Sequence, residues 1–522
     1  MKLRIISLIS AAALLLSLCA CVEKWPIDNA AGSGTVTDDI RKEETTAVTE
    51  TETETETETE TETETETEVE ETVETGFEID PETAAKASLY KGEKLTVLAN
   101  SGLWPADDIY RAEDSDDPVE SAVYQRSLYV TEKYGFDIEV IEDASAATTL
   151  KAAVLAGVPD YDAAAFCGYE ACPLACNNLF KDLTNIKNLD LDKLYWDQDI
   201  YDGLSFDNKL FFITGDISTK ANADTFIMTF NKDLAKSYGL DDLYEVVRSG
   251  EWTLDYLNDL IKEHGYVDNG NSKVDVYDTY GMGIQIEAYL AFYFGAGGAM
   301  VLKDNEQMPY FCLNTEKNIL ILDKIYDLTQ CDNKTIDAHN YLNEPPFSSG
   351  EGLASTVAFK ENRCLFYFTN AASLAGLKDM SADYGVLPCP KYDRDQANYR
   401  SYVYHGATLF MIPATNSRTD FTGFALEALA YESYKTVTPV YYEYLLKRDS
   451  KTDADSYEML DMAFRSRVWD LGYYARFGSI DDIFIRQIKK GTDVFDKWYK
   501  SVYKSPEKAI KKFIETYKKT WS

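Results

Sequence analysis

Histidine and the usual signatures of catalysis are scarce in this chain. Among 522 residues there are three histidines, His264, His339 and His405, which leave little room for a histidine-rich metal site. The sequence has no GxSxG elbow, no Walker loop, no GxGxxG fingerprint and no HExxH zinc motif. We therefore expect no catalytic residue, no cofactor and no metal.

Basic residues are also few. The chain has 51 Lys and Arg against 89 Asp and Glu, a net charge of −38, which argues against a nucleic-acid-binding protein. Hydrophobic residues make up 45% of the chain, so it is not disordered throughout. Aromatic residues, at 13%, exceed the needs of a plain core and indicate a surface that stacks on a ligand. The length predicts two or three compact units.

No apolar run reaches the ~20 residues that span a membrane. Residues 1–20 instead are typical of a bacterial export signal, with Lys2 and Arg4 before an apolar run. The run ends in residues 18–21, Leu-Cys-Ala-Cys, which resemble the lipobox of bacterial lipoproteins. The resemblance implies cleavage after Ala20 and a lipid on Cys21. The alternative is an ordinary secretory signal with two incidental cysteines.

A strongly acidic segment follows at 21–90. Residues 22–90 contain 22 acidic and 4 basic residues, and from Thr49 to Glu68 threonine and glutamate alternate strictly. Neither alternate position is apolar and the charges repel, so no face can be buried. We expect a disordered, extended tether, although a dispensable repeat would have the same composition.

Beyond the tether, strand and helix patterns alternate. Strands are predicted at 94–100, 136–141 and 161–167, and helices at 118–134 and from Ser145. Farther along, Thr253 and Ser505 are predicted to cap two helices. This order predicts a parallel sheet covered by helices, in which ligands bind at the carboxyl ends of the strands.

Six short segments together carry a family resemblance. They are 156–162, 180–183, 206–212, 226–234, 252–257 and 384–390. In this order, and after a lipobox, they resemble the extracellular solute-binding proteins of ABC importers, in the class that includes the maltodextrin-binding proteins. The resemblance covers roughly residues 91–400.

The resemblance implies an α/β fold of two lobes, of the type II periplasmic-binding-protein kind, hinged by crossing strands. Lobe 1 would comprise 91–220 and 395–440, and lobe 2 would comprise 221–394 and 441–522. The chain would be a lipid-anchored monomer on the outer face of the cell membrane. It would capture a carbohydrate, an oligosaccharide by preference, and deliver it to a membrane permease.

Nine residues are candidate ligand contacts, because aromatic rings stack on sugar faces while carboxylates and amides bond hydroxyls. The predicted stacking residues are Trp104, Tyr169, Tyr289, Tyr404 and Trp469, and the predicted polar partners are Glu170, Asp216, Asn370 and His405. Several of these residues also have a structural interpretation that involves no ligand. Asp216 suits a turn, Tyr289 a core, Asn370 a helix cap, and the pair 404–405 the packing of a hinge.

Several alternatives stay open from the sequence. A surface glycoside hydrolase would need two carboxyl groups ~5–10 Å apart across a cleft. A receptor that signals to a membrane kinase could use the same scaffold, and the ligand could be a peptide or a cationic solute. Of the seven cysteines after Cys21, at least one must be free, and Cys364 and Cys389 are predicted to be buried thiols.

Overall fold

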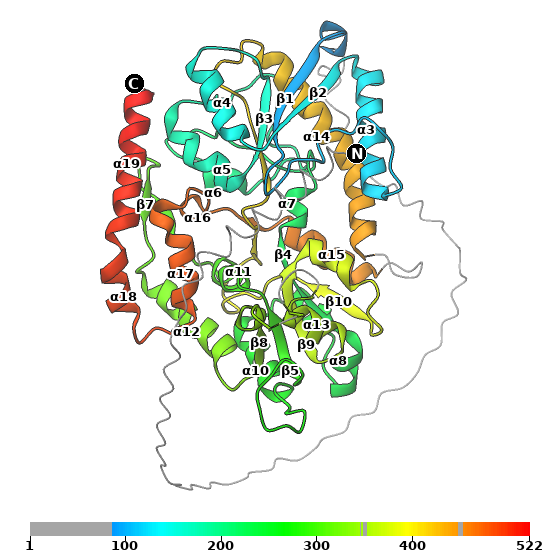
Figure 1. Cartoon of the computed structure of the whole chain (residues 1–522), viewed down its shortest axis with the longest axis vertical. Coiled ribbons are helices and arrows are strands. Elements are labelled where there is room, and N and C mark those ends of the chain that lie inside the picture. The colour runs from blue at the N-terminus through cyan, green and yellow to red at the C-terminus, as the bar shows by residue number, and fades with distance from the viewer. Residues whose placement is uncertain (1–85, 345, 348–351, 447–452, 522) are drawn as a thin grey trace, which may run out of the picture. The chain divides into compact units, whose positions relative to one another are not determined.

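A computed structural model describes residues 86–344, 346–347, 352–446 and 453–521 (Figure 1). The predicted export signal, Cys21 and the Thr–Glu tether lie outside the described residues. Within the described part, the strands form two large sheets and two small two-stranded ones. None of the helices there is both long and apolar enough to cross a membrane.

The first large sheet has the strand order β12-β3-β1-β2. Its strands are β1 (Lys94–Asn100), β2 (Asp137–Asp143), β3 (Ala163–Cys167) and β12 (Thr408–Met411). β1 is parallel to both β2 and β3, while β12 is antiparallel to β3. Nearly every residue of β1 and β3 is buried, because helices cover both faces of the sheet. These helices are α3 (Pro118–Tyr134), α4 (Ala146–Leu155) and α14 (Thr419–Leu446).

Local capping signals explain the ends of α3. The Asp117 carboxylate accepts hydrogen bonds from the backbone N–H groups of Val119 and Glu120, and Pro118 occupies the first helical position. Gly135 ends the helix at φ 76°, a left-handed conformation that suits glycine. The helix predicted at 118–134 is therefore confirmed.

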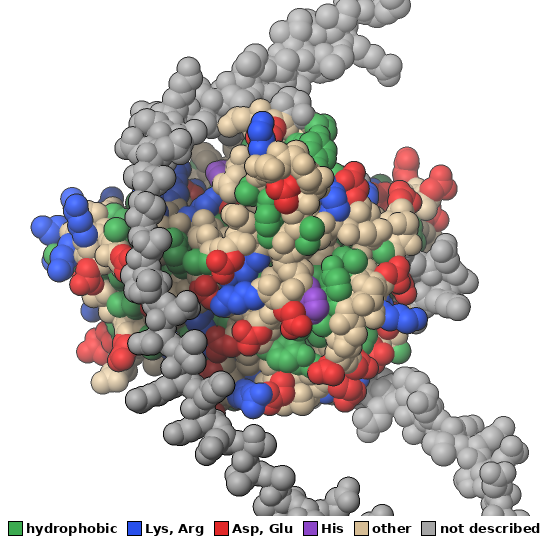
Figure 2. Space-filling model, turned by 90° about the horizontal axis from the view of Figure 1, so that it is seen from below, with side chains coloured by type: hydrophobic (Ala, Val, Ile, Leu, Met, Phe, Trp, Pro, Cys, Tyr) green, Lys and Arg blue, Asp and Glu red, His purple; other side chains and the backbone are tan. Residues whose placement is uncertain are grey.

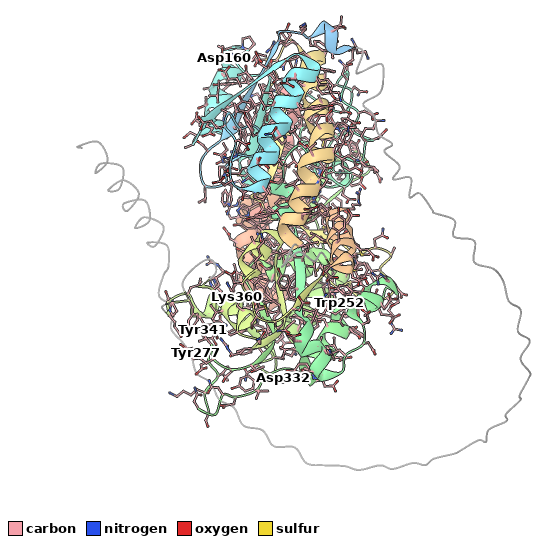
Figure 3. All side chains as sticks on the ribbon, turned by 90° about the vertical axis from the view of Figure 1, so that its right-hand side faces the viewer. Asp160, Trp252, Tyr277, Asp332, Tyr341 and Lys360 are labelled. Atoms are coloured by element: carbon pink, nitrogen blue, oxygen red, sulfur yellow. The ribbon has the colours of Figure 1, made fainter. Side chains whose placement is uncertain are left out.

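The second large sheet has the order β10-β4-β9-β5-β8. Its strands are β4 (Phe226–Asn231), β5 (Tyr280–Ile284), β8 (Thr335–Asp337), β9 (Cys364–Asn370) and β10 (Tyr384–Leu387). β5 is parallel to β8 and β9, whereas β4 is antiparallel to β9 and β10. Trp252, labelled in Figure 3, is fully buried in this lobe and donates its indole N–H to the Pro388 carbonyl at 2.9 Å.

Helices also surround the second sheet. They are α8 (Lys232–Tyr238), α9 (Leu243–Arg248), α10 (Leu254–Glu263), α11 (Ala288–Gly295), α12 (Glu316–Gln330), α13 (Ala354–Lys360) and α15 (Ala454–Phe464). Thr253 caps α10 by accepting a hydrogen bond from the Tyr256 N–H, as predicted. The C-terminal elements are α16 (Leu471–Tyr474), η7 (Phe477–Ser479), α17 (Ile480–Ile488), α18 (Phe495–Val502) and α19 (Lys504–Thr520).

Short elements complete the described chain. The small strands are β6 (Val301–Lys303), β7 (Pro309–Phe311), β11 (Ser401–Tyr402) and β13 (Arg467–Val468). The short helices are η2 (Lys86–Leu89), α5 (Gly168–Ala171), η3 (Cys172–Asn177), α6 (Ile200–Leu204), α7 (Lys220–Ala223), η4 (Ala338–Tyr341) and η6 (Ala371–Leu377).

The predicted cap at Ser505 is wrong. The last helix begins at Lys504, two residues before the predicted first position at Pro506, and Tyr503 before it keeps a helical conformation at φ −56°. No extended residue separates α18 from α19, so Ser505 has no cap position to fill. Pro506 lies in the first turn, where a missing N–H costs nothing.

The parallel strands of the two sheets point toward one another. Asp160 precedes β3, while Tyr277 and Asp332 precede β5 and β8. In Figure 3 Asp160 lies at the upper end of the described part, and the other two lie at the lower end. The carboxyl ends of these strands therefore face the region between the sheets. The limits of the two lobes at 220, 395 and 440 stay a prediction.

Acidic side chains are spread over the surface. The face seen in Figure 2 carries many Asp and Glu, with Lys and Arg between them. Interspersed charges of this kind keep a protein soluble and say little about a ligand. The chemistry of the region between the sheets has to be found from its own side chains.

Candidate functional site

Four strands end in the region between the sheets. β1 is followed by the loop that carries Trp104, and β3 by the turn α5, which carries Tyr169 and Glu170. In the second sheet, β5 is followed by Gln285 and β9 ends at Asn370. Ligands of open α/β sheets bind outside the carboxyl ends of the strands. This region is therefore the first candidate for a binding site.

Aromatic side chains from distant segments meet there. We call Trp104, Tyr169, Tyr404, His405 and Tyr473 the ring cluster. The His405 imidazole stacks on the Tyr169 ring with 3.5 Å between centroids and 6° between planes. The Trp104 indole meets the His405 ring edge-to-face at 4.5 Å and the Tyr404 ring at 6.3 Å. Four of the nine predicted contacts are thus brought together.

Hydrogen bonds between the Asn100 side chain and the backbone hold the Trp104 loop in place. The Asn100 side chain donates to the Trp104 carbonyl at 3.0 Å and accepts from the Gly102 N–H at 2.9 Å. Gly406 permits the close approach of the indole. A Cβ at that position would lie 2.8 Å from Trp104 Cδ1 and 2.7 Å from Asp224 Oδ2, so only glycine fits.

Tyr169 has both faces of its ring covered. His405 stacks on one face, and the Arg476 guanidinium lies over the ring at 4.5 Å from the centroid. The phenol donates to Asp481 Oδ2 at 2.7 Å, and Arg476 Nε bonds the same oxygen at 3.0 Å. A sugar can therefore stack on Tyr169 only after Arg476 moves. In this state Tyr169 positions its neighbours.

Burial and acidic side chains both affect the pKa of the Tyr404 phenol. Burial, followed by the negative charges of Glu287 and Asp224 and, less strongly, of Asp482, raises the pKa of Tyr404. Burial also raises the pKa of Asp224 to about 7, against the opposing charge of Lys220 and a hydrogen bond from Asn370. The carboxyl groups thus lie in a region that water solvates poorly.

His405 is held neutral. Burial, with the nearby charge of Arg476, lowers the pKa of His405 to about 3. Its Nδ1 lies 2.9 Å from the Tyr473 hydroxyl. Its Nε2, together with Glu170 Oε2 and Asp481 Oδ1, is buried and has no hydrogen-bond partner in the part of the chain that the structure describes. Buried polar atoms are normally satisfied, so these three can take a ligand or a water.

The other predicted contacts lie elsewhere or are already engaged. Asn370 accepts a hydrogen bond from the Ser373 hydroxyl at 2.8 Å at the start of η6. Asp216 accepts from the Thr438 hydroxyl at 2.7 Å beside a separate cavity of about 240 Å³, where burial raises the pKa of its carboxyl to about 6. Tyr289 is fully buried and donates to Asp337 Oδ2 at 2.9 Å, so it belongs to the core.

Trp469 also differs from its predicted surroundings. Its side chain is only 4% exposed and its indole N–H bonds Asp197 Oδ1 at 3.1 Å. It reaches the ring cluster indirectly, through Tyr474 at 5.2 Å and then Tyr473. Trp469 is therefore part of the packed wall beside the cluster.

A cavity of about 970 Å³ adjoins Trp469. Its lining comes from α6, the β6–β7 hairpin, residues 396–400 and residues 462–471. These segments do not follow the carboxyl ends of the parallel strands of the two large sheets. We therefore place the candidate site at the ring cluster.

Sequence reasoning missed four side chains of this site. Asp224 lies two residues before β4, and Glu287 lies just before α11. Arg476 and Asp481 follow α16, near the end of the chain. For Asp224 and Glu287 the sequence contained one signal, which is that each lies just before a segment with a recognisable strand or helix pattern. Nothing local singles out the last two.

Metal and disulfide chemistry have little to support them here. Across the described residues there is no group of three His, Cys, Asp or Glu side chains arranged to hold a metal ion. The seven cysteines from 167 to 389 are free thiols. Cys364 and Cys389 are buried, as predicted, and burial raises the pKa of Cys364 to about 12.

Comparisons with known proteins identify the fold. No family model and no curated protein matches the sequence. Among solved structures, UspC of M. tuberculosis matches with 16% identity over 80% of this chain and 100% of its own, at a TM-score of 0.53. The ABC substrate-binding protein Lmo0181 of Listeria monocytogenes, in complex with cycloalternan, has 14% identity over 83% of this chain and 99% of its own, at 0.47.

A third similar structure is a cyclo/maltodextrin-binding protein with maltotetraose, at 14% identity over 82% of this chain and 97% of its own, with a TM-score of 0.49. Identities this low bear on the fold alone. The match to UspC, together with the two sheets, confirms the two-lobed α/β fold that the sequence predicted.

Proposed function

We propose that this chain is the solute-binding component of an ABC importer and that its lobes close on a carbohydrate. A lipid on Cys21 anchors it to the outer face of the cell membrane, and the tether keeps the folded part away from the bilayer. A membrane permease receives the solute unchanged, and the chain acts as a monomer without catalysis.

One observation carries this proposal: segments of both sheets come together at Tyr404, whose ring contacts Trp104 and His405 and whose N–H donates to the carbonyl of Asp224, just before β4. Trp104 and Tyr169 follow strands of the first sheet, while Glu287 and Asn370 follow strands of the second. Rings of this kind stack on sugar faces. Carboxylates accept hydrogen bonds from hydroxyls, and amides both accept hydrogen bonds from hydroxyls and donate to them. A ligand held by both lobes favours the closed state, because only that state supplies all the contacts.

The proposal is tested by adding a panel of oligosaccharides to the full chain. A true ligand at 100 times its dissociation constant should stabilise the folded state by about 2.7 kcal/mol, seen as a higher melting temperature. X-ray scattering should report a smaller radius of gyration, and the sugar should be recovered intact. A cleaved sugar would indicate the hydrolase, and co-purification with a kinase in place of a permease would indicate the sensor.

Replacing Trp104 by alanine should weaken carbohydrate binding about tenfold or more, about 1.4 kcal/mol. The indole is half-buried in the loop after β1 and meets the Tyr169, Tyr404 and His405 rings edge-to-face. Calorimetric titration measures the loss. Trp498→Ala is the control, since Trp498 is half-buried against Phe484 and Phe495 away from the cluster. Equal affinities for the two variants would contradict the placement of the site.

A further inference from the structure

Carboxylates outnumber cations around the ring cluster. Asp224, Glu287 and Asp482 act on the Tyr404 phenol from three separate elements, the segment before β4, the start of α11 and α17. Glu170 adds a fourth carboxylate, which acts with Asp224 on the Cys167 thiol at the end of β3. Among the described residues, Lys220 acts on Asp224 and Arg476 is paired with Asp482.

Both of these cations already form ion pairs, Lys220 with an acid outside this group and Arg476 with Asp481 and with Asp482 of the group itself. Lys220 Nζ lies 2.6 Å from Asp107 Oδ1, on the loop after β1. Arg476 bonds Asp481 at 3.0 Å and Asp482 at 2.7 Å. Within the described ranges, neither Asp224 nor Glu287 forms an ion pair. Partly buried carboxylates without a counter-charge are costly, and a cation brought by a ligand would remove that cost.

The rings beside Asp224 suit the same cation. The Asp224 carboxylate and the Trp104 indole both approach within 2.8 Å of the point where Gly406 lacks a Cβ. The Tyr404 N–H donates to the Asp224 carbonyl at 2.8 Å, so the three residues are fixed relative to one another. A carboxylate next to aromatic rings is the arrangement that binds ammonium groups, through a charged hydrogen bond and the negative face of the ring.

We infer that the carbohydrate carries a protonated amino group, bound between the Asp224 carboxylate and the rings of Trp104 and Tyr404. The inference rests on the proposed function and narrows its ligand from carbohydrates in general to amino sugars. Glu287 contributes to the raised pKa of the Tyr404 phenol and is the second carboxylate without an ion pair in the described part of the chain. A neutral sugar or an acetylated amine would bring no cation to either carboxylate, and Asp224 would have only the charge of Lys220, which is already paired with Asp107.

Calorimetric titration of the full chain near neutral pH tests the preference for an amino group. The ligands are the trisaccharide of glucosamine, the same trisaccharide with its amines acetylated, and maltotriose. The glucosamine trisaccharide should bind at least about tenfold more tightly than the N-acetylated one. In Asp224→Asn the ratio of the two dissociation constants should fall to about one, and Glu287→Gln should reduce it as well. Asp379→Asn, an exposed acid away from the cluster, should keep the wild-type ratio.

Other results overturn the inference in distinct ways. If the neutral trisaccharides bind equally or more tightly, the ligand does not need an amino group, and the proposal of a carbohydrate ligand is unaffected. If both Asp224→Asn and Glu287→Gln keep the preference for the glucosamine trisaccharide, these two carboxylates do not recognise the amino group. If no carbohydrate of the panel binds at all, the proposed function itself fails.

Discussion

Replacing Trp469 by alanine is expected to lower the free energy of unfolding by about 3–5 kcal/mol, the usual cost of removing a buried tryptophan. The side chain is 4% exposed and packs against Tyr474, and Gly203 leaves it room. The substitution also removes the donor to Asp197 Oδ1. Urea unfolding followed by circular dichroism measures the change.

The half-buried Trp498 supplies the comparison, because Trp498→Ala should cost clearly less. The sequence alone predicts the opposite for Trp469, a loss of ligand affinity with an intact fold. If Trp469→Ala kept full stability and lost only affinity, the ligand would lie at the cavity beside Trp469 and not at the ring cluster.

Replacing Asp197 by alanine should destabilise the fold by about 3–5 kcal/mol, because it leaves a buried arginine without its counter-charge. Arg467 Nη1 lies 3.0 Å from Asp197 Oδ2, and both side chains are nearly inaccessible to water. The remaining partners of Arg467, the Thr225 hydroxyl and the Asn222 amide, are neutral and cannot replace the carboxylate. The same unfolding experiment measures the loss.

A surface ion pair provides the matched control. Arg465 and Asp461 lie 2.8 Å apart at the end of α15 and are 49% and 35% exposed, so Asp461→Ala should cost about 1 kcal/mol or less. Replacing Asp197 and Arg467 together by leucine and methionine should recover much of the loss, since no charge is then left buried. Equal losses for Asp197→Ala and Asp461→Ala would contradict the burial of the pair.

Capping residues and hydrophobic periodicity were enough to predict several of the elements. Asp117, Pro118 and Gly135 mark both ends of α3, and Thr253 marks the start of α10. These signals act within one turn of helix, so neighbours in the sequence decide them. Ser505 failed because the preceding helix ran directly into the last one, which residues 503–506 alone do not reveal.

Part of the site was predictable because it follows strands that the sequence pattern predicts. Trp104, Tyr169 and Glu170 follow predicted strands of a parallel sheet, and the carboxyl ends of such strands share one edge. Tyr289 lies in the core and Trp469 in a nearly buried wall, which the sequence could not tell apart from a surface because an aromatic residue has the same sequence signal in both. Packing against Asp337 and Asp197, far away in the chain, decides which it is.

Periodicity and caps were sufficient for the α/β class and for the strand ends at which a ligand is sought, because these are local properties of the chain. The two-lobed fold followed from the resemblance of six short segments to a known family. The folded chain was needed to show which rings touch, that Arg476 covers Tyr169, and that Asp224 and Glu287 stand without a paired cation. Burial and charge pairing depend on residues brought together from hundreds of positions apart, and no local pattern records them.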